Sequence, residues 1–195
     1  MAGSEFDHFC RNAFRFLEEA DVPYLVIGGL AVIVLGEPRT TGDADVIAFL
    51  TLEEAEALIL RARDAGFDLD EDQEAERLRQ TGTLCLRQSP FHLDLILASL
   101  PFENEALRRA RPRKLFGVAM PFPTPEDLLL FKVLAGRDKD LLDAQGVLRR
   151  HKGKLDLGYV EETLRSICDL AEEMAPWAHW MECLQKTGLA RGGDG

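Results

Sequence analysis

Two adjacent glycines, Gly28 and Gly29, constrain the fold of the first half of the chain more than any other feature. They follow a short apolar run, Tyr24 to Ile27, which predicts a buried strand. Glycine allows the sharp turn at which a strand gives way to a helix, so we expect a helix over residues 30–35. Residues 44–50 predict a second strand. This order of strand, turn, helix and strand indicates a small mixed α/β unit.

The neighbouring elements follow from the spacing of apolar residues. Helical periodicity predicts helices over residues 6–20 and 52–65. Two adjacent strands are expected at residues 83–87 and 91–98, joined by a short turn. The acidic span at residues 68–76 is interpreted as a solvated loop.

The pattern changes in the second half of the chain. Pro121 and Pro123 forbid a helix, so residues 114–123 are expected to be extended. Thr124 can cap a helix, and helices are predicted to fill most of residues 126–186. The sequence therefore predicts an α+β fold with two domains. A small mixed β-sheet core flanked by helices is expected over 1–120, and a helical C-terminal domain over 121–190.

The composition is that of a globular chain, since 46% of its 195 residues are hydrophobic. The early apolar run is too short to span a membrane, and no basic region precedes it as in a signal peptide. The four cysteines form no C-x-x-C pair and no metal-binding spacing with the four histidines, which indicates reduced thiols. We therefore expect a soluble, cytoplasmic protein without a membrane partner.

The charge is distributed unevenly along the chain. The net charge is −11, but residues 106–154 carry a net charge of +7. The overall negative charge makes duplex DNA a poor partner, because its phosphates would be repelled. The basic band could still attract a phosphate-bearing ligand. The plainer interpretation is a solvated basic surface.

Three aspartates are the candidate metal ligands. Asp43 and Asp45 are two apart at the start of a predicted strand, so their side chains share one face. Asp94 lies in an apolar strand, where a charge is costly unless it is paired or coordinated. If these strands are neighbours, three carboxylates converge, and Mg²⁺ is their natural partner. The alternative is that Asp43 is a turn residue and Asp45 a surface residue.

The glycine pair could also serve a ligand. Without side chains, the backbone N–H groups at Gly28 and Gly29 could approach a triphosphate at the positive end of a helix. A tight turn that binds nothing is the alternative.

Together these residues resemble the nucleotidyltransferase superfamily with the DNA polymerase beta-like fold. The pattern G-G-x-A, then G-x-P-R-x-T-x-D-x-D, then a later strand aspartate comprises Gly28, Gly29, Ala31, Gly36, Pro38, Arg39, Thr41, Asp43, Asp45 and Asp94. A second block at residues 132–143 is similar to the last motif of the abortive-infection toxin nucleotidyltransferases. The resemblance covers residues 20–150 and implies a nucleotidyltransferase core flanked by helices.

The resemblance implies metal-dependent transfer of a nucleotide monophosphate from a nucleoside triphosphate, with pyrophosphate leaving. The acceptor would be RNA, a protein or a small molecule, and a toxin-like role would add a cognate antitoxin as partner. The implied cofactor is Mg²⁺, with Mn²⁺ as an alternative. The implied catalytic and metal-binding residues are Asp43, Asp45 and Asp94, and the implied nucleotide-binding residues are Gly28, Gly29, Arg39, Thr41, Lys132 and Asp143.

The residues of the second block could bind a phosphate group. Lys132, Gly136, Asp140 and Asp143 are predicted to share one helix face, with open space at the glycine beside the lysine. Lys132 could then reach the β- or γ-phosphate, while the resemblance gives Asp143 an orienting role. A surface ladder of ion pairs is the alternative.

One departure from the family pattern keeps a second function open. Leu30 stands where many members carry a serine that helps to hold the triphosphate. This favours, as the alternative, a catalytically weakened nucleotide-sensing or partner-binding module with the same fold. The intact aspartate trio favours the enzyme, and the sequence does not separate an RNA or protein modifier from a small-molecule modifier.

Overall fold

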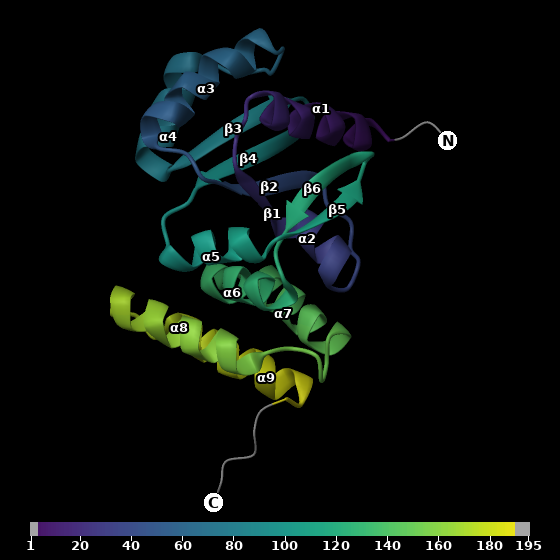
Figure 1. Ribbon diagram of the computed structural model, residues 1–195, viewed down its shortest axis with the longest axis vertical. Coiled ribbons are helices and arrows are strands. Elements are labelled where there is room, and N and C mark those ends of the chain that lie inside the picture. Colours follow the sequence, from purple (N-terminus) through teal and green to yellow (C-terminus); the bar gives the residue numbers. More distant parts are fainter. Residues whose placement is uncertain (1–3, 190–195) are drawn as a thin grey trace, which may run out of the picture. The chain divides into compact units, whose positions relative to one another are not determined.

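A four-stranded mixed sheet is built from the first half of the chain (Figure 1). The computed structural model describes residues 4–189, so residues 1–3 and 190 of the predicted domains lie outside it. The strands follow the order β1-β2-β4-β3; β2 pairs with β4 in parallel, and both other pairs are antiparallel. Their bounds are β1 Tyr24–Ile27, β2 Asp43–Ala48, β3 Thr83–Gln88 and β4 Phe91–Leu97.

Helices flank this sheet and fill the C-terminal part of the described chain, which confirms the predicted α+β class. The helices of the first half are α1 Glu5–Glu19, α2 Gly28–Leu35, α3 Leu52–Asp64, α4 Glu71–Thr81 and α5 Pro101–Arg109. The later ones are α6 Pro125–Ala135, α7 Asp138–Arg150, α8 Leu157–Ala171 and α9 Ala175–Thr187. Within residues 4–189, no helix is long and apolar enough to cross a membrane.

Helix α4 corrects the expectation that residues 68–76 form a solvated loop. The Asp70 side chain caps the helix by accepting from the Gln73 backbone N–H at 3.0 Å. The acidic residues of the first turn suit the positive end of the helix dipole. On the inner face of the helix, Leu78 is fully buried, and Glu74 accepts a hydrogen bond from the Cys85 N–H at 3.1 Å. The segment has so many charged residues that its partly apolar face was not recognised from the sequence.

A hairpin forms where only an extended segment was expected. Strands β5 (Arg111–Leu115) and β6 (Val118–Phe122) pair antiparallel as a separate two-stranded sheet. The turn between them places Phe116 and Gly117 at φ values of 53° and 85°. Glycine adopts this left-handed conformation without steric cost, which lets the chain reverse within two residues.

The described chain separates into two compact units. The first contains residues 4–30 and 40–122, and the second contains residues 31–39 and 123–189. Short segment 31–39 therefore groups with the C-terminal helices, although it precedes β2 in the sequence. Hydrogen bonds explain this grouping: Arg149 donates twice to Glu37 at 2.7 Å, and the His151 ring lies 2.7 Å from the Leu35 carbonyl oxygen.

Replacing Leu78 by alanine tests whether α4 is an integral part of the first unit. Because Leu78 is 1% exposed, Leu78→Ala should lower the free energy of unfolding by about 2–5 kcal/mol. Leu60→Ala is the control, since that side chain is 49% exposed and its loss should change the free energy by less than about 0.5 kcal/mol. Urea unfolding followed by circular dichroism measures both. Equal small changes would mean that α4 does not contribute to the core.

Candidate active site

The strand register brings the three predicted aspartates to one face of the sheet. In the parallel pairing of β2 with β4, Asp45 lies directly opposite Asp94, and Asp43 lies opposite His92. Paired positions on neighbouring strands are about 5 Å apart, and residues two apart share a face. The alternating residues Ala44 and Leu93 are fully buried on the opposite face. The apolar face therefore belongs to the core, while the aspartate face keeps partial access to solvent.

Two of the carboxylates lie near the ring of His92, and one of them also contacts an arginine. The Asp43 side chain is 60% exposed, and its Oδ1 lies 3.5 Å from the His92 Nδ1. Asp94 Oδ2 lies 3.9 Å from the His92 Nε2, and its Oδ1 lies 3.4 Å from the Arg77 Nη2. Within residues 4–189, no three His, Cys, Asp or Glu side chains are grouped so that they could hold a metal ion.

The residues nevertheless fit a hard divalent cation in chemistry and in backbone position. Mg²⁺ prefers carboxylate oxygens, and β2 and β4 supply three carboxylates from adjacent positions on one face. Asp94 is the residue whose present contacts oppose this use, because the positive charge of Arg77 beside its Oδ1 would repel a metal ion.

The glycine pair has a structural role that the sequence pattern did not reveal. Gly28 has a φ of 61°, and a Cβ atom there would lie 1.9 Å from Asp45 Oδ2. A Cβ at Gly29 would lie 2.5 Å from the Thr41 hydroxyl oxygen. The two glycines at the start of α2 therefore admit the side chains of Asp45 and Thr41. Thr41 in turn donates to the Asp43 carbonyl oxygen at 3.0 Å, which ties the residues before β2 to its first residue.

The second predicted block forms a buried ion-pair network instead of an exposed face. Lys132 is 4% exposed, and its ammonium donates to Asp140 at 2.7 Å and to Asp143 at 2.9 Å. Arg39 donates from two nitrogens to the two oxygens of Asp143, at 2.9 and 3.0 Å. Arg137 donates to Asp140 at 2.5 Å. The plainer interpretation, a surface ladder, is wrong in its location, since the lysine and both aspartates are buried.

The open space predicted at Gly136 is occupied. A Cβ atom at Gly136, whose φ is 65°, would lie 2.5 Å from the His179 ring. That ring also hydrogen-bonds the Val133 carbonyl at 3.1 Å, at the C-terminal end of α6. Gly136 therefore makes room for a side chain of α9, which the spacing of the block alone could not reveal.

The network lowers the pKa values of both its carboxyl groups. Burial raises the pKa of Asp143, but hydrogen bonds from Arg39 and Lys132 outweigh it and bring the pKa below its ordinary value. For Asp140, burial is likewise outweighed by hydrogen bonds from Arg137 and Lys132, so its pKa is also lowered. Both carboxyl groups are therefore ionised near neutral pH and keep the buried lysine paired.

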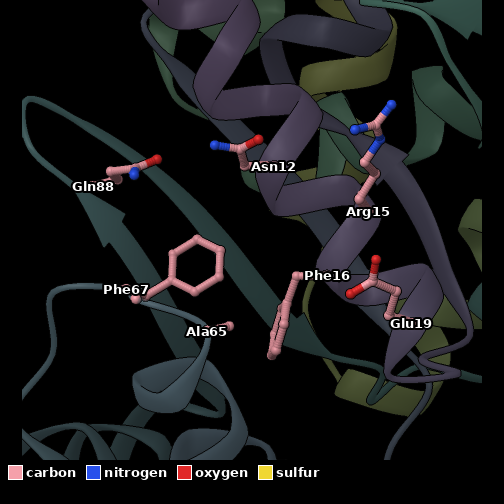
Figure 2. Close-up of a pocket in the computed structure, with 8 residues that line it drawn as sticks. Asn12, Arg15, Phe16, Glu19, Ala65, Phe67 and Gln88 are labelled. Atoms are coloured by element: carbon pink, nitrogen blue, oxygen red, sulfur yellow. The ribbon is translucent and has the colours of Figure 1, made fainter.

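A surface pocket elsewhere in the first unit does not involve these residues. It measures about 290 Å³ and lies against α1, the end of α3 and β3. Figure 2 shows Phe16 and Phe67 facing one another, with ring centroids 5.2 Å apart, among the polar side chains of Asn12, Arg15, Glu19 and Gln88. None of the predicted site residues lines this pocket.

No known family model and no curated protein matches the sequence. Among solved structures, the antibiotic-resistance factor ANT(2'')-Ia is similar with a TM-score of 0.51 at 10% identity, over 85% of this chain and 94% of that one. An antigenic nucleotidyltransferase-like protein from Paracoccidioides brasiliensis gives 0.49 at 16% identity, over 91% and 94%. The lincosamide antibiotic adenylyltransferase LnuA, bound to lincomycin, gives 0.47 at 16% identity, over 74% and 96%.

The likeness to ANT(2'')-Ia shows that this chain shares the fold of that antibiotic-resistance factor. The mixed sheet carries paired carboxylates on one face, and a glycine turn opens α2 beside them. At such low identity the likeness establishes the fold and not the reaction.

Sequence analysis did not identify Arg77, which contacts Asp94 from helix α4. Arg77 follows the acidic span 68–76, which was expected to be a loop, and no helix was predicted to extend over it. The signal that could have revealed it was the Asp70 cap followed by the buried position Leu78.

Removing the buried ammonium should destabilise the second unit. Lys132→Met removes the buried partner that Asp140 and Asp143 share and leaves each with a more exposed arginine, so we expect a loss of about 3–5 kcal/mol in the free energy of unfolding. Fluorescence of the buried Trp180, in the same unit, follows the urea transition. Lys139→Met, at an exposed position of α7, is the control. A loss below about 1 kcal/mol for Lys132→Met would contradict a structural role for the network.

The lowered pKa values also predict a pH dependence. A carboxyl group whose pKa is lower in the folded state stabilises the fold above its unfolded value, and the stability is lost as pH falls through the folded pKa. Stability should therefore decline as pH falls below about 3.8, the ordinary aspartate value. Asp143→Asn should be less stable at pH 7 and show a shallower acid decline. Asp169→Asn, exposed on α8, should follow the wild type; identical profiles for all three would contradict the assignment.

Proposed function

We propose that the protein transfers a nucleotide monophosphate from a nucleoside triphosphate to an acceptor hydroxyl, with Mg²⁺ or Mn²⁺ as cofactor. The observation that carries this proposal is the register of β2 and β4, which sets Asp45 beside Asp94 and Asp43 beside His92 on one partly exposed face. The glycine turn at the start of α2 adjoins the same carboxylates through the close approach of Gly28 to Asp45. The shared fold supports this class of reaction.

Each residue of the face has a role in this proposal. Asp43, Asp45 and Asp94 would hold the cation, which supplies polarisation of the reacting phosphorus and neutralises charge on the leaving pyrophosphate. Asp94 would also accept the proton of the acceptor hydroxyl at a carboxylate oxygen. The backbone N–H groups that follow Gly28 and Gly29 would donate to the phosphates at the positive end of α2, with Thr41 close to Gly29.

Of the proposed roles, triphosphate binding by the block at residues 132–143 requires the largest rearrangement of existing contacts. Lys132 would have to leave Asp140 or Asp143 to meet a phosphate, and Arg39 would have to leave Asp143. We therefore assign to these residues, first, the task of holding residues 31–39. Direct contact of Lys132 and Arg39 with a triphosphate, oriented by Asp143, is the second part of the proposal.

The acceptor is proposed as RNA, a protein or a small molecule. A fold shared with an antibiotic-resistance factor makes small hydroxyl compounds worth including from the outset. A narrower proposal is a toxin of the abortive-infection type with a cognate antitoxin in the cytoplasm. Its acceptor would be RNA or a protein.

A catalytically weakened nucleotide-binding module is the second candidate. The contact between Arg77 and Asp94 favours it, because a guanidinium beside Asp94 offsets the negative charge that would attract a metal ion. Saturable binding of a triphosphate without any transfer would identify this function.

Asp45→Asn tests the enzymatic proposal. The protein is incubated with each α-labelled triphosphate and Mg²⁺, together with total RNA, total protein or a panel of hydroxyl compounds. The wild type should label one class of acceptor, and Asp45→Asn should reduce labelling at least a hundredfold while its melting temperature stays equal or rises, since one of three close carboxylates is neutralised.

Asp64→Asn is the matched control, because this side chain is 68% exposed at the end of α3. It should label like the wild type. Equal labelling by Asp45→Asn and the wild type would refute the assignment of Asp45. Loss of several kcal/mol of stability in Asp45→Asn would make the residue structural.

A further inference from the structure

The environment of Asp94 contains a cation from the protein itself. Arg77 projects from α4, which lies beside β3 in Figure 1, and its Nη2 lies 3.4 Å from Asp94 Oδ1. Its Nη1 lies 3.5 Å from Glu74 Oε2 and is buried without a hydrogen-bond partner. The guanidinium thus stands between two carboxylates, and its side chain is only 31% exposed.

Both contacts of Arg77 are long. Charge-assisted hydrogen bonds of arginine to a carboxylate are typically about 2.7–2.9 Å, whereas these measure 3.4 and 3.5 Å. They offset charge without the geometry of a bidentate pair. A divalent cation approaches carboxylate oxygens to about 2.0–2.1 Å and would displace such a contact.

We propose that Arg77 is the resting counter-ion of Asp94 and competes with the metal ion for this carboxylate, so that it lowers the affinity of the site. This inference rests on the proposed function, because it requires a cation to bind at the aspartate face. In the metal-free protein, Arg77 offsets the repulsion between Asp94 and the adjacent Asp45. When a bound cation offsets this repulsion instead, the guanidinium moves away from Asp94 and keeps its contact with Glu74. Arg77 is thus a positioning residue that acts through Asp94.

The geometry separates Arg77 from Arg79, the other basic residue of α4. Arg79 is 51% exposed and contacts Glu56 and Glu76, neither of which lies on the sheet. Arg79 carries the same positive charge, lies on the same helix and does not contact Asp94. It is therefore a matched control for any general effect of removing a positive charge from α4.

The experiment is a titration of the full chain with Mn²⁺ alone, with free ion measured by electron paramagnetic resonance. Arg77→Met should bind Mn²⁺ about two- to fivefold more tightly than the wild type, as expected for removal of a partly exposed ion pair. Arg79→Met should bind like the wild type. In an Asp94→Asn background, Arg77→Met should no longer tighten binding, because the competition requires both residues.

The outcomes distinguish this inference from the proposed function. If the wild type binds Mn²⁺ and Arg77→Met binds equally or more weakly, the competition is refuted and the metal site stands. If neither protein binds Mn²⁺ at millimolar concentration, the metal site itself is refuted, and this inference with it. Arg77→Gln is the second variant should Arg77→Met not fold by circular dichroism; it is also neutral and should show the same tightening.

Discussion

The ammonium of Lys132, buried between Asp140 and Asp143, is the interaction on which the second unit depends. Charges removed from water are stabilising only when each has a partner, and here two aspartates are matched by Lys132, Arg39 and Arg137. Through Arg39 the network also holds the segment that leads into β2. Further hydrogen bonds from Arg149, Arg150 and His151 to residues 35–37 hold the same segment. Four residues of the basic band, Lys132, Arg137, Arg149 and Arg150, are therefore engaged with the protein's own backbone and carboxylates.

The candidate active site depends on a different constraint, the parallel pairing of β2 with β4. Its register alone places Asp45 beside Asp94, and the absence of side chains at Gly28 and Gly29 leaves room for Asp45 and Thr41. Three carboxylates on one face repel one another, so the metal-free protein must offset their charge. Arg77 does so for Asp94, and His92 lies within 4 Å of both Asp43 and Asp94. Under the proposed function, a metal-binding face and this counter-ion arrangement would be two states of the same residues.

The sequence predicted the parts that depend on local periodicity. The four strands of the mixed sheet, the helix after the glycines and the face shared by Asp43 and Asp45 follow from spacing, and the fold class is confirmed. Helix α4 was missed because its charge concealed Leu78. The prediction that Lys132 shares one helix face with Asp140 and Asp143 is wrong, because α6 ends before Gly136 and the two aspartates lie on α7. Their contact and their burial depend on packing between the two helices. Likewise, His179 fills the space at Gly136 from a distant helix, a contact that no local pattern encodes.

The most direct test of the central claim is a crystal structure of the protein with Mn²⁺ and a non-hydrolysable nucleoside triphosphate. The account predicts an anomalous peak about 2.0–2.5 Å from carboxylate oxygens of at least two of Asp43, Asp45 and Asp94, with Asp94 turned away from Arg77. It also predicts phosphate oxygens at the backbone N–H groups that open α2. A triphosphate bound elsewhere, or an aspartate face that stays free of the ion at saturating Mn²⁺ with Asp94 still against Arg77, would contradict it.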